Sequence, residues 1–212
     1  SKDPNSGRRQ AMLYADCLER KFGRRPVMYT TNGFDTYFWD DRSSPQRKVS
    51  SICGKDDLQK LMNRRAEHLN LMAIPIDDRI TDRYYQKAAI RAVCEQIEQG
   101  FRKHLLVMAT GTGKTRTASS LVDVLSRGKY VTNVLFLADR TALVKQAKDD
   151  FKNYLPDMSL CNLCLNKDDY QARIVFSTYP TMLNILDDVK TKNGERLFTQ
   201  ADVEMIILDE RY

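Results

Sequence analysis

The feature that most constrains the fold is a glycine-rich loop near the middle of the 212-residue chain. An apolar run at residues 105–109 (LLVMA) leads directly into this loop, as a buried strand would. Two glycines allow backbone N–H groups to turn towards a phosphate, and a helix expected at residues 114–126 adds the positive end of its dipole. A lysine then supplies charge to the β and γ phosphates, and the next threonine can ligate Mg²⁺. The predicted nucleotide-binding residues are Thr110, Gly111, Thr112, Gly113, Lys114 and Thr115.

A pair of acidic residues near the end of the sequence fits the same chemistry. Asp209 and Glu210 follow an apolar run at residues 205–208, which predicts a strand. An acid at such a strand end can hold Mg²⁺, and its neighbour can orient and deprotonate the water that attacks the γ phosphate. We therefore predict ATP and Mg²⁺ as ligands, Thr115 and Asp209 as metal-binding residues, and Asp209, Glu210 and Lys114 as the catalytic set.

The rest of this region alternates between helical and strand patterns. Strands that are apolar throughout and alternate with helices indicate a parallel sheet with helices on both faces, which is an α/β nucleotide-binding architecture. Helices are predicted at residues 82–99, 114–126, 140–154 and 179–189, and strands at 105–109, 133–138, 174–178 and 205–208.

The first third of the chain has a different pattern. Helical spacing predicts an amphipathic helix at residues 8–22 that ends at Gly23, with Ala11, Met12, Tyr14, Ala15 and Leu18 as its apolar face. Two β-prone runs at 26–31 and 36–39 flank an Asn-Gly turn, which predicts a hairpin. A polar loop is expected at 42–48 and a further helix at 56–71, and Pro75 interrupts the helical period, so we place a boundary near residues 73–78.

Composition limits the class of protein without identifying it. Lysine and arginine number 34 against 28 acidic residues, a net charge of +6 with a pI near 9.0, which is compatible with a polyanionic partner. No apolar run is long enough for a membrane span and the first residues are polar, so we expect a cytoplasmic protein. Five scattered cysteines favour reduced thiols, and the lone pair Cys161 and Cys164 is expected to be structural.

Several motifs in order resemble those of superfamily 2 helicases and translocases. The resemblance implies a RecA-like fold in which Gln86, beside Tyr84, reads the adenine edge as in the Q motif. Residues 135–147 and 174–182 are similar to motifs Ia and Ib, which face the nucleic-acid backbone in that superfamily. Their hydroxyl and basic side chains are suited to phosphate contacts, and the predicted DNA-binding residues are Arg140, Lys145, Ser177 and Thr178.

The amino-acid sequences of the glycine-rich loop and of motif Ia further resemble those of the R (restriction and motor) subunits of type I restriction-modification enzymes, the HsdR family. In that family a PD-(D/E)xK nuclease precedes the motor, and Gln10 and Tyr14 fit its Gln-x-x-x-Tyr helix. The implied domains are the C-terminal part of a nuclease-like α/β domain at 1–48, a linker helix at 49–78 and the first RecA-like lobe at 79–212. The implied partners are double-stranded DNA and the modification and specificity subunits.

The same resemblance sets expectations for activity. The metal-binding Asp and Glu-x-Lys of such a nuclease, and the second motor lobe with its arginine finger, are not found in these residues, so we expect ATP binding without DNA cleavage and with little turnover. Arg211 and Tyr212 depart from the family pattern, in which a small residue and His follow Asp-Glu. Two alternatives stay open: another superfamily 2 helicase of the type III restriction or repair kind, and a non-catalytic, nucleotide-gated binding module.

Overall fold

A computed structural model describes residues 7–42, 44–49, 51–165, 172–188 and 203–210. The chain forms two compact units. The first unit contains Ser1–Glu67 and Glu95–Leu105, and the second contains His68–Cys94 and Leu106–Tyr212. The domain boundaries inferred from the sequence stay predictions.

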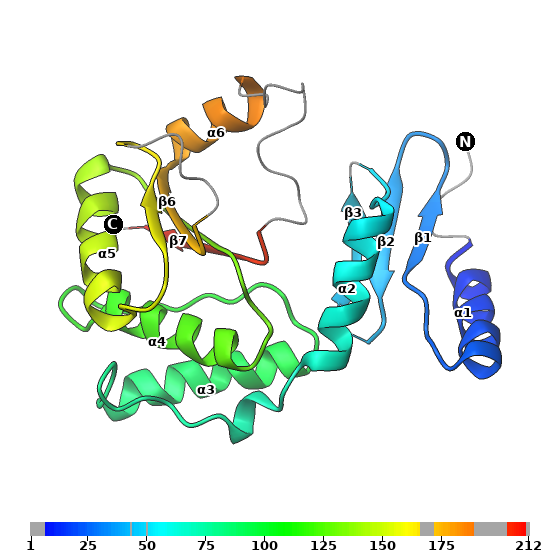
Figure 1. Cartoon of the computed structure of the whole chain (residues 1–212), viewed down its shortest axis with the longest axis horizontal. Helices are drawn as coiled ribbons and strands as arrows, with labels where there is room; N and C mark the ends of the chain where they lie inside the picture. Colours follow the sequence, from blue (N-terminus) through cyan, green and yellow to red (C-terminus); the bar gives the residue numbers. More distant parts are fainter. Residues whose placement is uncertain (1–6, 43, 50, 166–171, 189–202, 211–212) are drawn as a thin grey trace. The chain divides into compact units, whose positions relative to one another are not determined.

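The second unit is built on a parallel sheet of four strands in the order β5-β6-β4-β7 (Figure 1). In its register Ala138 lies opposite both Thr178 and Asp209, so three strands end at the same edge of the sheet. The predicted strands at 133–138, 174–178 and 205–208 are confirmed, whereas the three-residue strand β5 was not predicted. The strands are β4 (Val134–Ala138), β5 (Leu160–Asn162), β6 (Ile174–Thr178) and β7 (Met205–Asp209).

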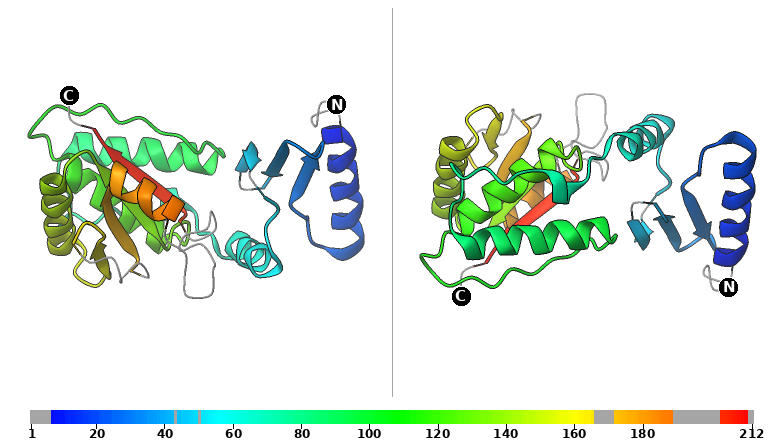
Figure 2. Two further views of the ribbon diagram at one scale, coloured as in Figure 1. Left: turned by 90° about the horizontal axis from the view of Figure 1, so that it is seen from above. Right: turned by 90° about the horizontal axis from the view of Figure 1, so that it is seen from below.

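Helices cover both faces of this sheet, which confirms the predicted α/β class. On one face, the rings of Phe136 and Phe176 meet Phe151 of α5 at centroid distances of 5.7 and 5.3 Å. On the other face, a buried cluster joins β4 and β6 to Met182 and Ile185 of α6. Figure 2 shows α6 and α4 on opposite sides of the strands. The helices are α3 (Tyr84–Glu98), α4 (Lys114–Arg127), α5 (Thr141–Tyr154) and α6 (Tyr179–Asp188).

The strand predicted before the glycine-rich loop is not formed. Residues 105–109 have no regular secondary structure, and Leu105 and Val107 are 87% and 89% exposed. The prediction was wrong because a strand needs a hydrogen-bonded neighbour, and none of the described strands pairs with this segment. β7 is an edge strand among the described residues, and its apolar side chains Ile206 and Leu208 are more than half exposed.

The first unit packs one helix against an antiparallel sheet. The predicted helix is confirmed in full, and Gly23 ends it with a left-handed φ of 69°. The hairpin turn is also confirmed: Asn32 Oδ1 accepts hydrogen bonds from the N–H groups of Phe34 and Asp35. The elements are α1 (Arg8–Phe22), β1 (Met28–Thr31), β2 (Thr36–Asp40), β3 (Ser44–Val49) and α2 (Lys55–Glu67), with strand order β1-β2-β3.

Three local expectations for this unit were wrong. The expected loop at 42–48 is largely the edge strand β3, in which charged residues and Pro45 are tolerated because no described strand pairs with its outer side. On the predicted apolar face of α1 only Ala15 is buried, where it packs with Met28 and Trp39. The helix expected to reach residue 71 ends at Glu67. A short 3-10 helix at Leu71–Ala73 follows, and the side chain of Asn70 caps its N-terminus.

In the parts of the chain that the structure describes, no helix has both the length and the apolar character needed to cross a bilayer. All five cysteines are free thiols, and Cys161 is buried in the core of the second unit.

Candidate nucleotide-binding site

The glycine-rich loop has the backbone shape that its sequence indicates. Gly111 and Gly113 have φ values of 78° and 86°, in the left-handed region that side chains rarely adopt. Between them the Thr112 hydroxyl donates to the carbonyl oxygen of Ala109 at 2.6 Å, which closes the turn. Thr110 is exposed and contributes backbone to the same turn.

Gly113 is also the N-cap of α4, so the loop leads directly into a 14-residue helix. No side chain caps this N-terminus. Lys114 and Thr115 stand at the first turn of the helix and are partly exposed. The N–H groups of a helix start, its dipole and a lysine together form a site suited to an anion.

Two neighbouring side chains at the start of α3 donate hydrogen bonds to the loop. Gln86, which is fully buried, donates from Nε2 to the Thr112 carbonyl at 2.7 Å, and the Tyr85 hydroxyl donates to the same oxygen at 3.1 Å. The other end of the Gln86 amide accepts a hydrogen bond from the hydroxyl of Thr81, which is also buried. The sequence did not single out Tyr85 or Thr81, and reading of adenine by Gln86 stays a prediction.

Tyr84 lies beside this contact but faces solvent. Its side chain is 84% exposed, and its ring meets that of Tyr85 edge to face at 5.6 Å. Two adjacent tyrosines therefore differ in position: Tyr85 touches the loop, whereas Tyr84 presents a free ring face beside it. An exposed aromatic ring offers a surface on which a base can stack.

The predicted acids lie at the carboxyl edge of the sheet. Asp209 ends β7 and is partly exposed, and Glu210 follows it and is exposed. Burial raises the pKa of Tyr179, the first residue after β6, and the negative charges of Glu210, Asp139 and Asp209 raise it further. Tyr179, directly after β6, therefore lies near acidic groups at the ends of β4 and β7, although it was not among the predicted site residues. Its buried hydroxyl makes no hydrogen bond within the described residues.

The structure does not itself form a metal site from these acids. Within residues 7–42, 44–49, 51–165, 172–188 and 203–210, no three His, Cys, Asp or Glu side chains gather closely enough to hold an ion. Coordination of Mg²⁺ by Thr115 and Asp209 stays a prediction. Arg211 and Tyr212, which depart from the family pattern, lie outside the described residues.

The four predicted DNA-binding residues fall into two classes. Arg140, the N-cap of α5, and Lys145 on the same helix are exposed. Ser177 and Thr178 are buried, and their hydroxyls donate within the protein, to the Thr178 carbonyl at 3.2 Å and to Thr181 at 2.9 Å. The expectation that Ser177 and Thr178 offer surface donors is therefore corrected, because the last residues of a central strand point into the two covered faces of the sheet.

The first unit holds a hydrogen-bonded pair and an ionic cluster. Gln10 donates to the Tyr14 hydroxyl at 2.9 Å on the exposed face of α1.

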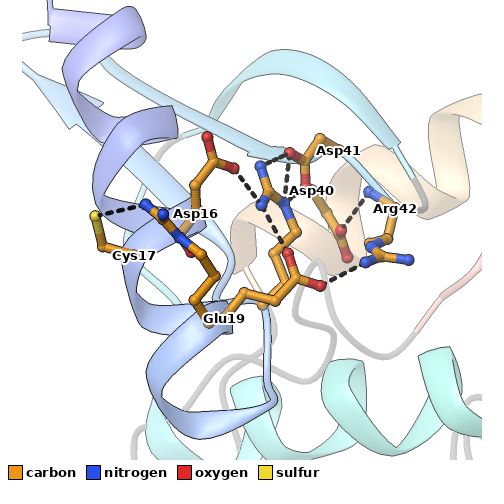
Figure 3. Close-up of polar contacts among 8 residues, drawn as sticks. Asp16, Cys17, Glu19, Asp40, Asp41 and Arg42 are labelled. Atoms are coloured by element: carbon orange, nitrogen blue, oxygen red, sulfur yellow. Dashed lines mark hydrogen bonds and ion pairs between the residues drawn. The ribbon is translucent and has the colours of Figure 1, made fainter.

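Arg25, which is only 11% exposed, binds Asp16 at 2.6 Å, Glu19 at 2.8 Å and Asp41 (Figure 3). These carboxylates raise the pKa of the guanidinium, so Arg25 stays charged and ties α1 to the ends of β1 and β2. Sequence reasoning missed Arg25, since its partners come from distant positions.

The chain is similar to a protein-family model, to curated relatives and to solved structures. A protein-family model described as "Type III restriction enzyme, res subunit" matches residues 79–211. The Type I restriction enzyme EcoAI endonuclease subunit of Escherichia coli is 48% identical over 162 residues, which cover 70% of this chain and 19% of that protein. The UvrABC system protein B of Bifidobacterium longum is 31% identical over 125 residues, covering 57% of this chain and 16% of its own length.

Among solved structures, a fragment of a putative HsdR subunit of a type I restriction enzyme from Vibrio vulnificus aligns with 99% of this chain and 37% of its own chain. The alignment has a TM-score of 0.47 and 24% identity. The chain thus spans about a fifth or less of the curated relatives named above.

Proposed function

Because the chain belongs to the family described as Type III restriction enzyme, res subunit, we propose that it is the ATP-binding portion of a DNA-translocating motor. The observation that carries the proposal is the loop itself: Gly111 and Gly113 hold left-handed backbone immediately before α4, and Lys114 and Thr115 begin that helix. This is the arrangement in which backbone N–H groups, a helix dipole and an ammonium group meet a polyphosphate.

Each remaining residue has a proposed role in hydrolysis of ATP. Lys114 neutralises the β and γ phosphates, Thr115 and Asp209 hold Mg²⁺, and Glu210 orients the attacking water. We propose that the ring of Tyr84, which is exposed, stacks on the base. The acids at the carboxyl edge of the sheet fit the general rule that parallel α/β sheets bind ligands at that edge.

The longer protein is proposed to be the R subunit of a type I restriction enzyme, a hydrolase that couples ATP hydrolysis to movement along duplex DNA and to cleavage. Supporting this are the 48% identity to the EcoAI endonuclease subunit and the exposed basic residues Arg140 and Lys145 at one end of α5. Modification and specificity subunits are the proposed protein partners, and Gln10 and Tyr14 the proposed remnant of a nuclease motif. We propose that the complex acts in the cytoplasm.

Nucleotide binding is tested by replacing the loop lysine. Lys114→Ala should weaken ATP affinity by about tenfold to a hundredfold, because a charge-assisted contact to phosphate is lost. A fluorescent ATP analogue titrated into the purified chain measures this, and Lys145→Ala serves as a matched control that removes an exposed lysine from α5. An ATP affinity that is the same in Lys114→Ala and in the control would contradict the site.

A repair helicase is the second candidate, and the 31% identity to a UvrABC system protein B supports it. The two candidates differ in the longer protein: the restriction subunit cleaves DNA when ATP is supplied, whereas a repair helicase hydrolyses ATP without cutting. Agarose gels of plasmid DNA incubated with ATP, Mg²⁺ and the full-length protein together with modification and specificity subunits separate the two. Tight ATP binding with no hydrolysis, even when DNA is added, would instead indicate a nucleotide-gated binding module.

A further inference from the structure

A single backbone carbonyl in the glycine-rich loop receives two side-chain donors. Gln86 Nε2 and the Tyr85 hydroxyl both donate to the oxygen of Thr112, at 2.7 and 3.1 Å. Arg83 in turn donates to the Tyr85 hydroxyl at 2.9 Å, and the Thr81 hydroxyl donates to Gln86 Oε1. Neighbours on both sides therefore hold the two donors in place.

The direction of that carbonyl decides where the next N–H group points. In a trans peptide the C=O of one residue and the N–H of the next point in opposite directions, and the structure contains no cis peptide in its described residues. Holding the Thr112 oxygen towards α3 therefore aims the Gly113 N–H away from α3. If this peptide flipped, a carbonyl oxygen would take the place of the N–H, and it would repel a phosphate.

Gln86 also packs against the loop so closely that only glycine fits there. A Cβ atom placed on Gly113 would lie 2.5 Å from Gln86 Nε2. The amide is fully buried, and both of its ends already have partners in the protein. An amide in this position cannot also read the edge of a base unless it gives up the loop.

We propose that Gln86 and Tyr85 form a latch on the Thr112 carbonyl that keeps the phosphate loop in its anion-binding shape, whichever base the nucleotide carries. The latch residues are positioning residues, since they act through the loop backbone. This inference rests on the proposed nucleotide site and assigns to Gln86 a different task from adenine recognition.

The test compares three ligands that share a polyphosphate and differ in the base: ATP, GTP and inorganic tripolyphosphate. Gln86→Glu keeps the shape and the acceptor for Thr81 but replaces the donor to Thr112 with an oxygen. Tyr85→Phe removes the second donor, and Tyr37→Phe is its matched control because Tyr37 lies on β2 of the first unit, in neither the loop nor α3. Calorimetric titration of the 212-residue chain gives each affinity, and thermal unfolding checks that each variant is folded.

The latch predicts that Gln86→Glu weakens binding of all three ligands by the same factor, about fivefold to tenfold, and that Tyr85→Phe weakens all three by about twofold to fivefold. Tyr37→Phe should change none of them. A loss confined to ATP, or unchanged affinities in a folded Tyr85→Phe, would overturn the latch. If the unsubstituted chain bound none of the three ligands, the proposed nucleotide site would fail and the latch with it, which distinguishes that failure from failure of the latch alone.

Discussion

Arg25 shows how much one side chain contributes when its three partners converge from two segments. Asp16 and Glu19 come from α1 and Asp41 follows β2, and all three carboxylates bind one guanidinium that is largely buried. Arg25→Ala should lower the free energy of unfolding by about 1–3 kcal/mol, because charged hydrogen bonds are lost and the acids then repel one another. Trp39, the single tryptophan, is buried in the same unit and reports its unfolding in urea by fluorescence.

Arg25→Lys is the control for that change. It keeps the charge but offers three donors on one nitrogen instead of the five donors of the planar guanidinium, so the stability that it loses should lie between zero and that lost by the alanine variant. Equal stability of the alanine variant and the unsubstituted chain would show that the cluster does not hold α1 in place.

Glu19 makes the same cluster sensitive to acid. The hydrogen bond from Arg25, followed by that from Arg42, lowers the pKa of Glu19 below its ordinary value of 4.5. A carboxyl with a lowered pKa in the folded state stabilises the protein fully above its unfolded pKa, and this stabilisation is lost as pH falls through the folded pKa. Stability of the first unit should therefore decrease from about pH 4.5 downwards, and Glu19→Gln should show a smaller decrease in the same urea titrations followed by Trp39.

Among the helices, α5 shows how the packed face of one element supports the sheet. Phe151 is fully buried and its ring meets Phe136 and Phe176 edge to face. Phe151→Ala should lower the free energy of unfolding by about 3–5 kcal/mol, since a large cavity opens under two strands. Gln146→Ala, at an exposed position of the same helix, should change it by less than about 0.5 kcal/mol. Far-ultraviolet circular dichroism during denaturation compares the two.

Elements whose character depends on their own residues could be predicted, and elements that depend on a neighbour could not. The strand at 174–178 and the helix at 8–22 match the sequence pattern residue for residue. The run at 105–109 has an equally apolar pattern, yet it is not a strand, because pairing requires a second segment that the pattern does not contain. For the same reason β3, which is polar, was missed: its partner β2 supplies the hydrogen bonds.

The candidate site divides in a similar way. The glycines and Lys114 could be selected because their task depends on local backbone and charge. The burial of Ser177 and Thr178 and the contacts of Tyr85 and Thr81 could not be foreseen, since they arise from the packing of separate elements.

At the scale of the whole molecule, exposed apolar residues predict self-association. Leu105 and Val107 are almost fully exposed, and Ile206 and Leu208 are exposed on β7. Apolar surface and unpaired strand edges promote association between copies. Val107→Lys should therefore lower the average mass measured by analytical ultracentrifugation at high concentration, whereas Phe34→Lys, at a residue that is 90% exposed in the hairpin turn, should not. Equal masses for both variants would contradict this account.

The position of β7 at the edge of the described sheet has a consequence for exchange with solvent. In a parallel strand, successive N–H groups point alternately to one side and to the other. β4 lies on one side of β7, and no described strand lies on the other. Deuterium uptake along β7 should therefore alternate between slow and fast from each residue to the next, and this alternation would disappear if another strand came to lie beside it.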